Sequence, residues 1–118
     1  MDLRTGSRVV AGHHVLTLDG TVDLAATPRL HDVLRRFVGL EPPRPILVDL
    51  DGVTVLDDAA LGLLLGAAAT TRANGRTFAV VCSDTRMRKR LTETRFDRAV
   101  AVHPSLGAAV ADDVHEVP

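Results

Sequence analysis

The sequence predicts an α/β domain with a mixed, mainly parallel sheet of about five strands and about four helices. Short valine-rich runs alternate with amphipathic helical segments, an order typical of parallel sheets with right-handed crossovers. The chain has 118 residues, 46% of them hydrophobic, which suffices for one core. Only 3% of residues are aromatic, so we expect that core to consist mainly of Val, Leu and Ala.

The N-terminal third combines extended segments with one clear helix. Residues 15–18 alternate as in a strand, and residues 8–10 are expected to pair with them through a hairpin at Gly12. Asp19-Gly20 is a turn or bulge signal. Thr27 and Pro28 are typical of a helix start, as cap and first residue. An apolar stripe then runs to the Gly39 stop, formed by Leu30, Val33, Leu34, Phe37 and Val38.

The rest of the chain repeats a strand-helix order after the proline-rich linker 41–45. Strands 46–50 and 77–82 are apolar on both faces, which favours interior, parallel positions. The remaining elements are a helix over 59–73, a basic helix from Ser83 or Asp84 to Thr94, a short strand over 99–102 and a last helix over 105–111. We expect a single domain over residues 1–118, its core at about 8–112 and its tail frayed over 112–118.

Charge and cysteine content narrow the possible functions. A net charge of -1 provides no overall positive potential that would attract nucleic acid or an anionic membrane surface. No apolar run approaches the roughly 20 residues of a membrane span. The single Cys82 excludes an internal disulfide and suits the cytoplasm, and its place after an apolar run predicts a packed core thiol.

Residues 48–66 are the most informative stretch. A buried strand ends in acidic residues, a short loop is expected, and Asp57-Asp58 then precede a helix of small and apolar residues. Helical periodicity predicts one face that packs on the sheet, formed by Leu61, Leu64, Leu65 and Ala68. The opposite face is uncharged, which is unusual for a surface helix, and gathers Ala59, Leu63, Gly66, Ala67 and Thr70.

Two interpretations of this uncharged face stay open. Another helix of the same domain covers it, or another protein docks there with Leu63 as the apolar anchor. Asp57 and Asp58 also allow two roles, because carboxylates stabilise a helix N-terminus and an acidic patch attracts a basic partner. An uncharged helix face is equally compatible with a homodimer.

An enzymatic interpretation begins from residues 46–53, which resemble the first motif of haloacid-dehalogenase-type phosphatases. There Asp49 would be the nucleophile and Asp51 the acid/base, with Mg²⁺ balancing the charge. However, no later strand ends in a second acidic pair, and the histidines lack metal-ligand spacing. Glycine-rich phosphate-binding motifs are also absent from the sequence. We therefore expect a protein that is not an enzyme and needs no metal or cofactor.

Three patches in order resemble the STAS domain, specifically the bacterial anti-sigma factor antagonists. Residues 18–23 are similar to the family's early strand, and residues 48–62 to its central strand-loop-helix motif, usually Asp-Ser-Ser-Gly-Leu-Gly. Residues 88–106 are similar to the third helix, last strand and start of the final helix. The resemblance spans roughly residues 8–112 and implies a STAS-like fold.

The resemblance implies regulation by partner switching in the cytoplasm. An antagonist of this family binds an anti-sigma factor, often a serine kinase, which inactivates it by phosphorylating the second serine of the motif. A phosphate adds about two negative charges, enough to disrupt an apolar interface.

The motif departs from the family at that serine. Ala59 occupies its position, Asp58 replaces the serine before it and Ala60 the glycine after it, so phosphorylation at residue 59 is impossible. Thr54, expected in the preceding loop, is a disfavoured substitute acceptor. Either the domain binds its partner without phosphorylation control, or Asp58 supplies a fixed charge that resembles the phosphorylated state; we favour the first, because a carboxylate one residue away is a weak mimic of phosphate. A second departure is Arg95 at a usual glycine, where a left-handed conformation costs about 1 kcal/mol, so we expect a different local turn.

These features define an expected binding surface for an anti-sigma factor or a related regulator. A subunit or scaffold of a transport or signalling assembly is the alternative, and direct membrane insertion and nucleic-acid binding are not expected. Asp23 is expected at the same end of the sheet, shaping the loop. The expected contact residues are Asp23, Thr54, Asp57, Asp58, Ala59, Ala60, Gly62, Leu63, Gly66, Ala67 and Thr70.

Overall fold

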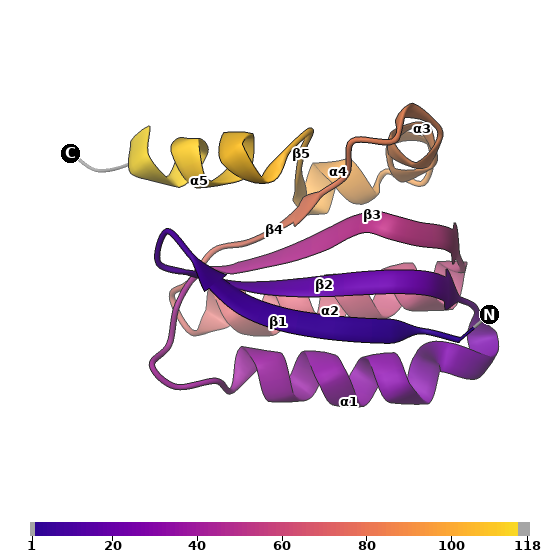
Figure 1. The fold of residues 1–118 in the computed structure, drawn as a ribbon, viewed down its shortest axis with the longest axis horizontal. Helices are drawn as coiled ribbons and strands as arrows, with labels where there is room; N and C mark the ends of the chain where they lie inside the picture. Colours follow the sequence, from indigo (N-terminus) through magenta and orange to yellow (C-terminus); the bar gives the residue numbers. More distant parts are fainter. Residues whose placement is uncertain (1, 116–118) are drawn as a thin grey trace.

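The structure is a computed structural model that describes residues 2–115, with side chains described up to residue 111. Its five strands form one sheet in the order β1-β2-β3-β4-β5 (Figure 1). β1 is antiparallel to β2, and the other neighbours are parallel, so the predicted fold class is confirmed. The strands are β1 (Arg4–Val10), β2 (His13–Val22), β3 (Ile46–Leu56), β4 (Phe78–Val81) and β5 (Ala101–His103).

Helices cover both faces of the sheet and create two cores. α1 and α2 lie side by side along one face and enclose the larger core, whereas α5 lies on the other side, near β4 and β5 (Figure 1). Parallel strands need such crossover helices, which accounts for their valine-rich, doubly buried sequences. The helices are η1 (Leu24–Ala26, a 3₁₀ turn), α1 (Thr27–Val38), α2 (Asp58–Ala73), α3 (Thr85–Glu93), α4 (Phe96–Ala99) and α5 (Leu106–His115).

The pairing of β2 with β3 is irregular beside Asp19-Gly20, where a turn or bulge was predicted, but the extra residues lie in β3 and not in this dipeptide. The pairing of β2 with β3 shifts register on either side of this dipeptide but continues to Val22 and Leu56. β3 therefore extends to Leu56, and the loop predicted after residue 50 is wrong. Thr54 consequently lies in a strand, and its hydroxyl donates to the Gly20 carbonyl at 3.2 Å.

Other element boundaries also differ from the prediction. Thr27 does not cap α1 from outside the helix: Asp23 caps the preceding η1, and the Thr27 hydroxyl donates to the Leu24 carbonyl. α4 was not predicted, because four residues are too few for a helical period. α5 continues to His115, so the tail predicted from Asp112 overlaps its end, and residues 116–118 lie outside the described residues.

Between residues 2 and 115, two non-glycine residues adopt left-handed backbone conformations. Ala11 (φ 49°) precedes Gly12 (φ 79°) in the predicted β1–β2 hairpin, and two positive φ angles are typical of a type I′ turn. Arg95 has φ 63° and ψ 15° between α3 and α4. The expected different turn was therefore wrong at this position, since the arginine adopts the conformation that a glycine would favour.

Candidate functional site

The acidic end of the sheet forms where β2 and β3 finish together. The Asp57 amide donates to the Val22 carbonyl at 2.9 Å, which places Asp57 beside the start of the β2–α1 connection. Asp23 accepts a hydrogen bond from the Ala26 amide at 3.1 Å and so caps η1. Asp23, Thr54 and Asp57 are thus brought to one end of the sheet, as was predicted for Asp23.

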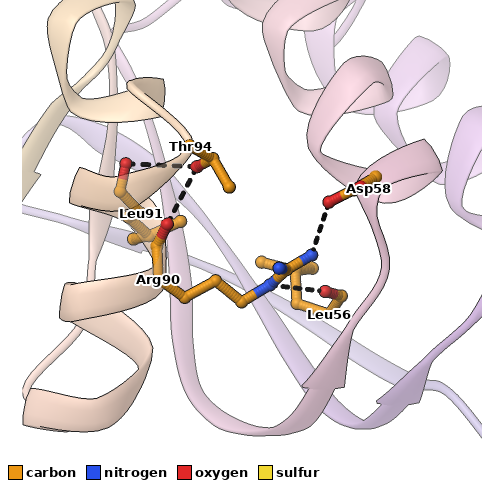
Figure 2. Close-up of polar contacts among 5 residues, drawn as sticks. All are labelled: Leu56, Asp58, Arg90, Leu91 and Thr94. Carbon is orange, nitrogen blue, oxygen red and sulfur yellow. Dashed lines mark hydrogen bonds and ion pairs between the residues drawn. The ribbon is translucent and has the colours of Figure 1, made fainter.

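Asp58 is held by an arginine from a distant helix (Figure 2). The Arg90 guanidinium contacts the Asp58 carboxylate with an Nη2–Oδ1 distance of 2.8 Å, and its Nε donates to the Leu56 carbonyl at 2.9 Å. Asp58 remains 83% exposed, so the pair is solvated. Arg90 therefore joins α3 to the start of α2 and partly neutralises the acidic end.

Asp57 and Asp58 both lie at the N-terminus of α2, which corresponds to the first of the two roles left open for them. Asp57 occupies the N-cap position of α2, although its side chain makes no capping hydrogen bond within the described residues. Asp58 lies in the first turn, where a carboxylate is favoured by the helix dipole. The sequence did not predict that Arg90 contacts Asp58. The only sequence feature that pointed to Arg90 was its position in the basic helix.

The exposed side of α2 differs from the predicted one. Leu65, predicted to pack on the sheet, is 37% exposed, whereas Ala60 (0%) and Ala67 (9%) are buried. The reason is that α2 packs against α1 as well as the sheet. The buried face of α2 therefore includes the side chains that point toward α1. The exposed side is formed by Asp58, Ala59, Gly62, Leu65, Gly66, Ala69 and Thr70, and carries no charge after Asp58 until Arg72.

A groove of about 500 Å³ lies where α1 and α2 meet and is lined by residues of both helices. Leu63 lines it and is half-buried against the core, so it is less available than Leu65. Helix α1 thus covers one flank of the uncharged side, as one open interpretation predicted, and leaves the rest exposed. The lining residues are His31, Leu34, Arg35, Val38, Gly62, Leu63, Gly66, Ala67 and Thr70.

The two carboxylates of the phosphatase-like motif have structural roles. Asp49 accepts a hydrogen bond from the Asp51 amide at 2.9 Å. Asp51 accepts bonds from the Ser83 amide at 2.6 Å and hydroxyl at 3.0 Å, which tie β3 to the loop after β4. Among the described residues, no group of three potential metal ligands surrounds them. The arrangement therefore offers no support for the phosphatase interpretation.

Comparison with known proteins shows the family. The STAS domain profile matches residues 7–109, and the chain belongs to the STAS family. A search of the curated proteins found no match.

Solved structures show the same fold at low sequence identity. An anti-sigma factor antagonist from Mycobacterium paratuberculosis has a TM-score of 0.81 at 23% identity, with 98% of this chain and 96% of that chain covered. A sulfate transporter family protein from Wolinella succinogenes has a TM-score of 0.74 at 18% identity, covering 92% and 89%. Phosphorylated SpoIIAA of Bacillus has a TM-score of 0.66 at 15% identity, covering 94% and 98%.

Across the residues that the structure describes, no helix is long and apolar enough to cross a bilayer.

Proposed function

We propose that this STAS domain is a cytoplasmic, non-enzymatic antagonist that binds an anti-sigma factor of the serine kinase type, or a related regulator. The observation that carries the proposal is the exposed, uncharged side of α2 with Leu65 on it, next to the acidic end of the sheet. A surface helix normally shows charges to solvent, so this side favours a protein partner. The similarity to anti-sigma factor antagonists supports the same class of partner.

The expected contact residues take different roles in this proposal. Asp23 and Asp57 charge the acidic end, and Thr54 adds an exposed polar side chain there. Leu65 replaces Leu63 as the main apolar anchor. Ala60 and Ala67 are buried and support the helix from beneath. The residues that offer exposed surface on α2 are Asp58, Ala59, Gly62, Gly66 and Thr70, with Leu63 at the groove.

The partner would bind without phosphorylation control at residue 59. Ala59 is exposed in the first turn of α2 and has no hydroxyl. Asp58 is a poor substitute for a phosphate, because Arg90 already contacts its carboxylate. The docking side therefore stays free of a full, unpaired negative charge.

The decisive experiment is a tagged pull-down from the source cells with mass spectrometry, using wild type, Leu65→Glu and Ala59→Ser. We expect a kinase-like regulator to bind wild type, to be lost with Leu65→Glu, and to phosphorylate only the Ala59→Ser variant. Leu65 is exposed, so its substitution should leave the fold intact, which circular dichroism would check. Recovery of the same regulator with Leu65→Glu would remove α2 from the interface.

A transport or signalling assembly is the second candidate. The TM-score of 0.74 with a sulfate transporter family protein supports it, and so does the missing phosphoacceptor. In that case the pull-down would recover transporter or scaffold subunits, and neighbouring genes would encode transporters rather than sigma factors. Recovery of this chain alone would instead indicate a homodimer.

A further inference from the structure

We propose that the groove between α1 and α2 is the seat for an amphipathic helix of the partner, with an acidic side chain placed to meet Arg35. This inference rests on the proposed function and names the chemistry of the partner segment. The groove lies beside the exposed side of α2, so one partner can contact both.

The shape of the groove favours a helix as the occupant. α1 and α2 run side by side, and the lining residues of α1 extend from His31 to Val38, about two helical turns. Grooves between helices accept a partner helix through apolar side chains that recur every three or four residues. Leu34 and Leu63 supply an apolar floor for those anchors.

Two glycines on the α2 wall allow the partner backbone to come close. Gly62 and Gly66 are four residues apart on one side of the helix, and a Cβ built on either meets no atom within 4 Å. Both positions are exposed, so the wall is open to solvent rather than filled from within. A helix approaching this wall would meet backbone instead of side chains.

The charge of the groove selects an acidic segment. Arg35 and His31, one turn apart on α1, are the only ionisable residues among the described residues that line the groove. Arg35 is exposed, and no hydrogen bond or ion pair found among the described residues involves its guanidinium. By contrast, the hydroxyl of Thr70 on the opposite wall already donates to the Gly66 carbonyl at 3.1 Å. An acidic side chain would therefore be attracted to the α1 wall.

The test uses the regulator recovered in the pull-down, prepared as a pure protein, and isothermal titration calorimetry. Gly66→Leu fills the groove without strain, because leucine is a good helix former and the space is open. We expect it to weaken binding by about tenfold or more. Arg35→Glu should also weaken binding by about tenfold and reduce its dependence on salt.

Arg36→Glu is the matched control. It makes the same change of net charge one residue further along α1, but Arg36 lines a different hollow, between α1 and β1. We expect its affinity to stay within about twofold of wild type. An equal loss with Arg36→Glu and Arg35→Glu would mean a general charge effect and would overturn the assignment of the groove.

A photo-crosslinking amino acid at the exposed position Thr70 identifies the occupant directly. The expected product links this site to a helical partner segment that carries Asp or Glu beside apolar residues. A crosslink to a second copy of this chain, or to a basic segment, would overturn the inference.

The outcomes separate the two proposals. If Leu65→Glu abolishes binding while Gly66→Leu and Arg35→Glu do not, the proposed function stands and the groove is not the seat. If pure wild-type protein binds no regulator, both proposals fail.

Discussion

Arg90 on α3 and Asp58 at the start of α2 form an ion pair between residues 32 positions apart in the sequence. The same guanidinium donates to the carbonyl of Leu56, the last residue of β3 (Figure 2). One side chain therefore connects the end of the central strand, the first turn of the proposed docking helix and the basic helix. The Asp58 carboxylate, which the sequence offered only as a weak phosphate mimic, is therefore engaged within the domain.

The Arg90 contacts predict unequal effects of removing the two partners. An exposed ion pair contributes roughly 0.2–1 kcal/mol, so Asp58→Asn should lower the free energy of unfolding by less than about 0.5 kcal/mol. Arg90→Ala also removes the hydrogen bond to Leu56 and should cost about 1–1.5 kcal/mol. Urea unfolding measures both, with Arg86→Ala, exposed on the same helix, as the control. Equal losses for Arg90→Ala and Arg86→Ala would contradict the contact.

We predict that replacing Arg95 by glycine stabilises the protein. The Arg95 φ of 63° is unfavourable for a residue with a Cβ, so Arg95→Gly should raise the free energy of unfolding by about 0.5–1 kcal/mol. Arg98→Gly in α4 is the control and should lower it by about 1 kcal/mol, because glycine is disfavoured within helices. Chemical denaturation of the two variants should therefore give shifts of opposite sign, and two losses would refute the prediction.

We predict that substitution of Gly20 causes a large loss of stability. Gly20 has φ 93°, and a Cβ there would lie 2.4 Å from the Asp2 backbone oxygen, so Gly20→Ala should cost about 2–4 kcal/mol. Gly62→Ala places the same methyl group on a helix facing open space and should stabilise the protein by about 0.5–1 kcal/mol. Thermal unfolding distinguishes the two. A tolerated alanine at Gly20 would show that the backbone around Gly20 and Asp2 rearranges.

Because Cys82 is buried, we predict that the free energy of unfolding falls as the pH rises into the alkaline range. Cys82 is fully buried, as predicted for a core thiol, and burial raises the pKa of the Cys82 thiol above its ordinary value of 9.0. The unfolded thiol thus ionises at lower pH than the folded one. Its stabilising contribution is complete below pH 9.0 and is lost as pH rises from there through the folded pKa.

The measurement for Cys82 compares wild type and Cys82→Ala by urea unfolding at about pH 8 and about pH 10. Wild type should lose more stability over this range than the variant, whose other titrating groups are the same. Parallel losses in the two proteins would show that the thiol does not contribute to the pH dependence.

Sequence reasoning was accurate where local pattern decides structure. The apolar stripe of α1 and the valine-rich strands have periods that a single segment reveals, and they lie where predicted. The same reasoning failed for α2, where an almost uniformly small and apolar helix has little amphipathic contrast. Leu65 was predicted to pack on the sheet because the sequence does not show how α2 is placed against α1 and β3, and it is in fact exposed. Its exposure follows from how α1 packs.

The sequence by itself determined the class of fold, the order of its strands and longer helices and the loss of the serine at residue 59, because these depend on local periodicity and residue identity. Only the tertiary structure decided that Arg90 meets Asp58, that β3 continues through the bulge to Leu56, and that α1 and α2 leave a groove between them. Each of these relationships joins segments distant along the chain. Their geometry comes from strand register and helix packing, which one segment's residues do not encode alone.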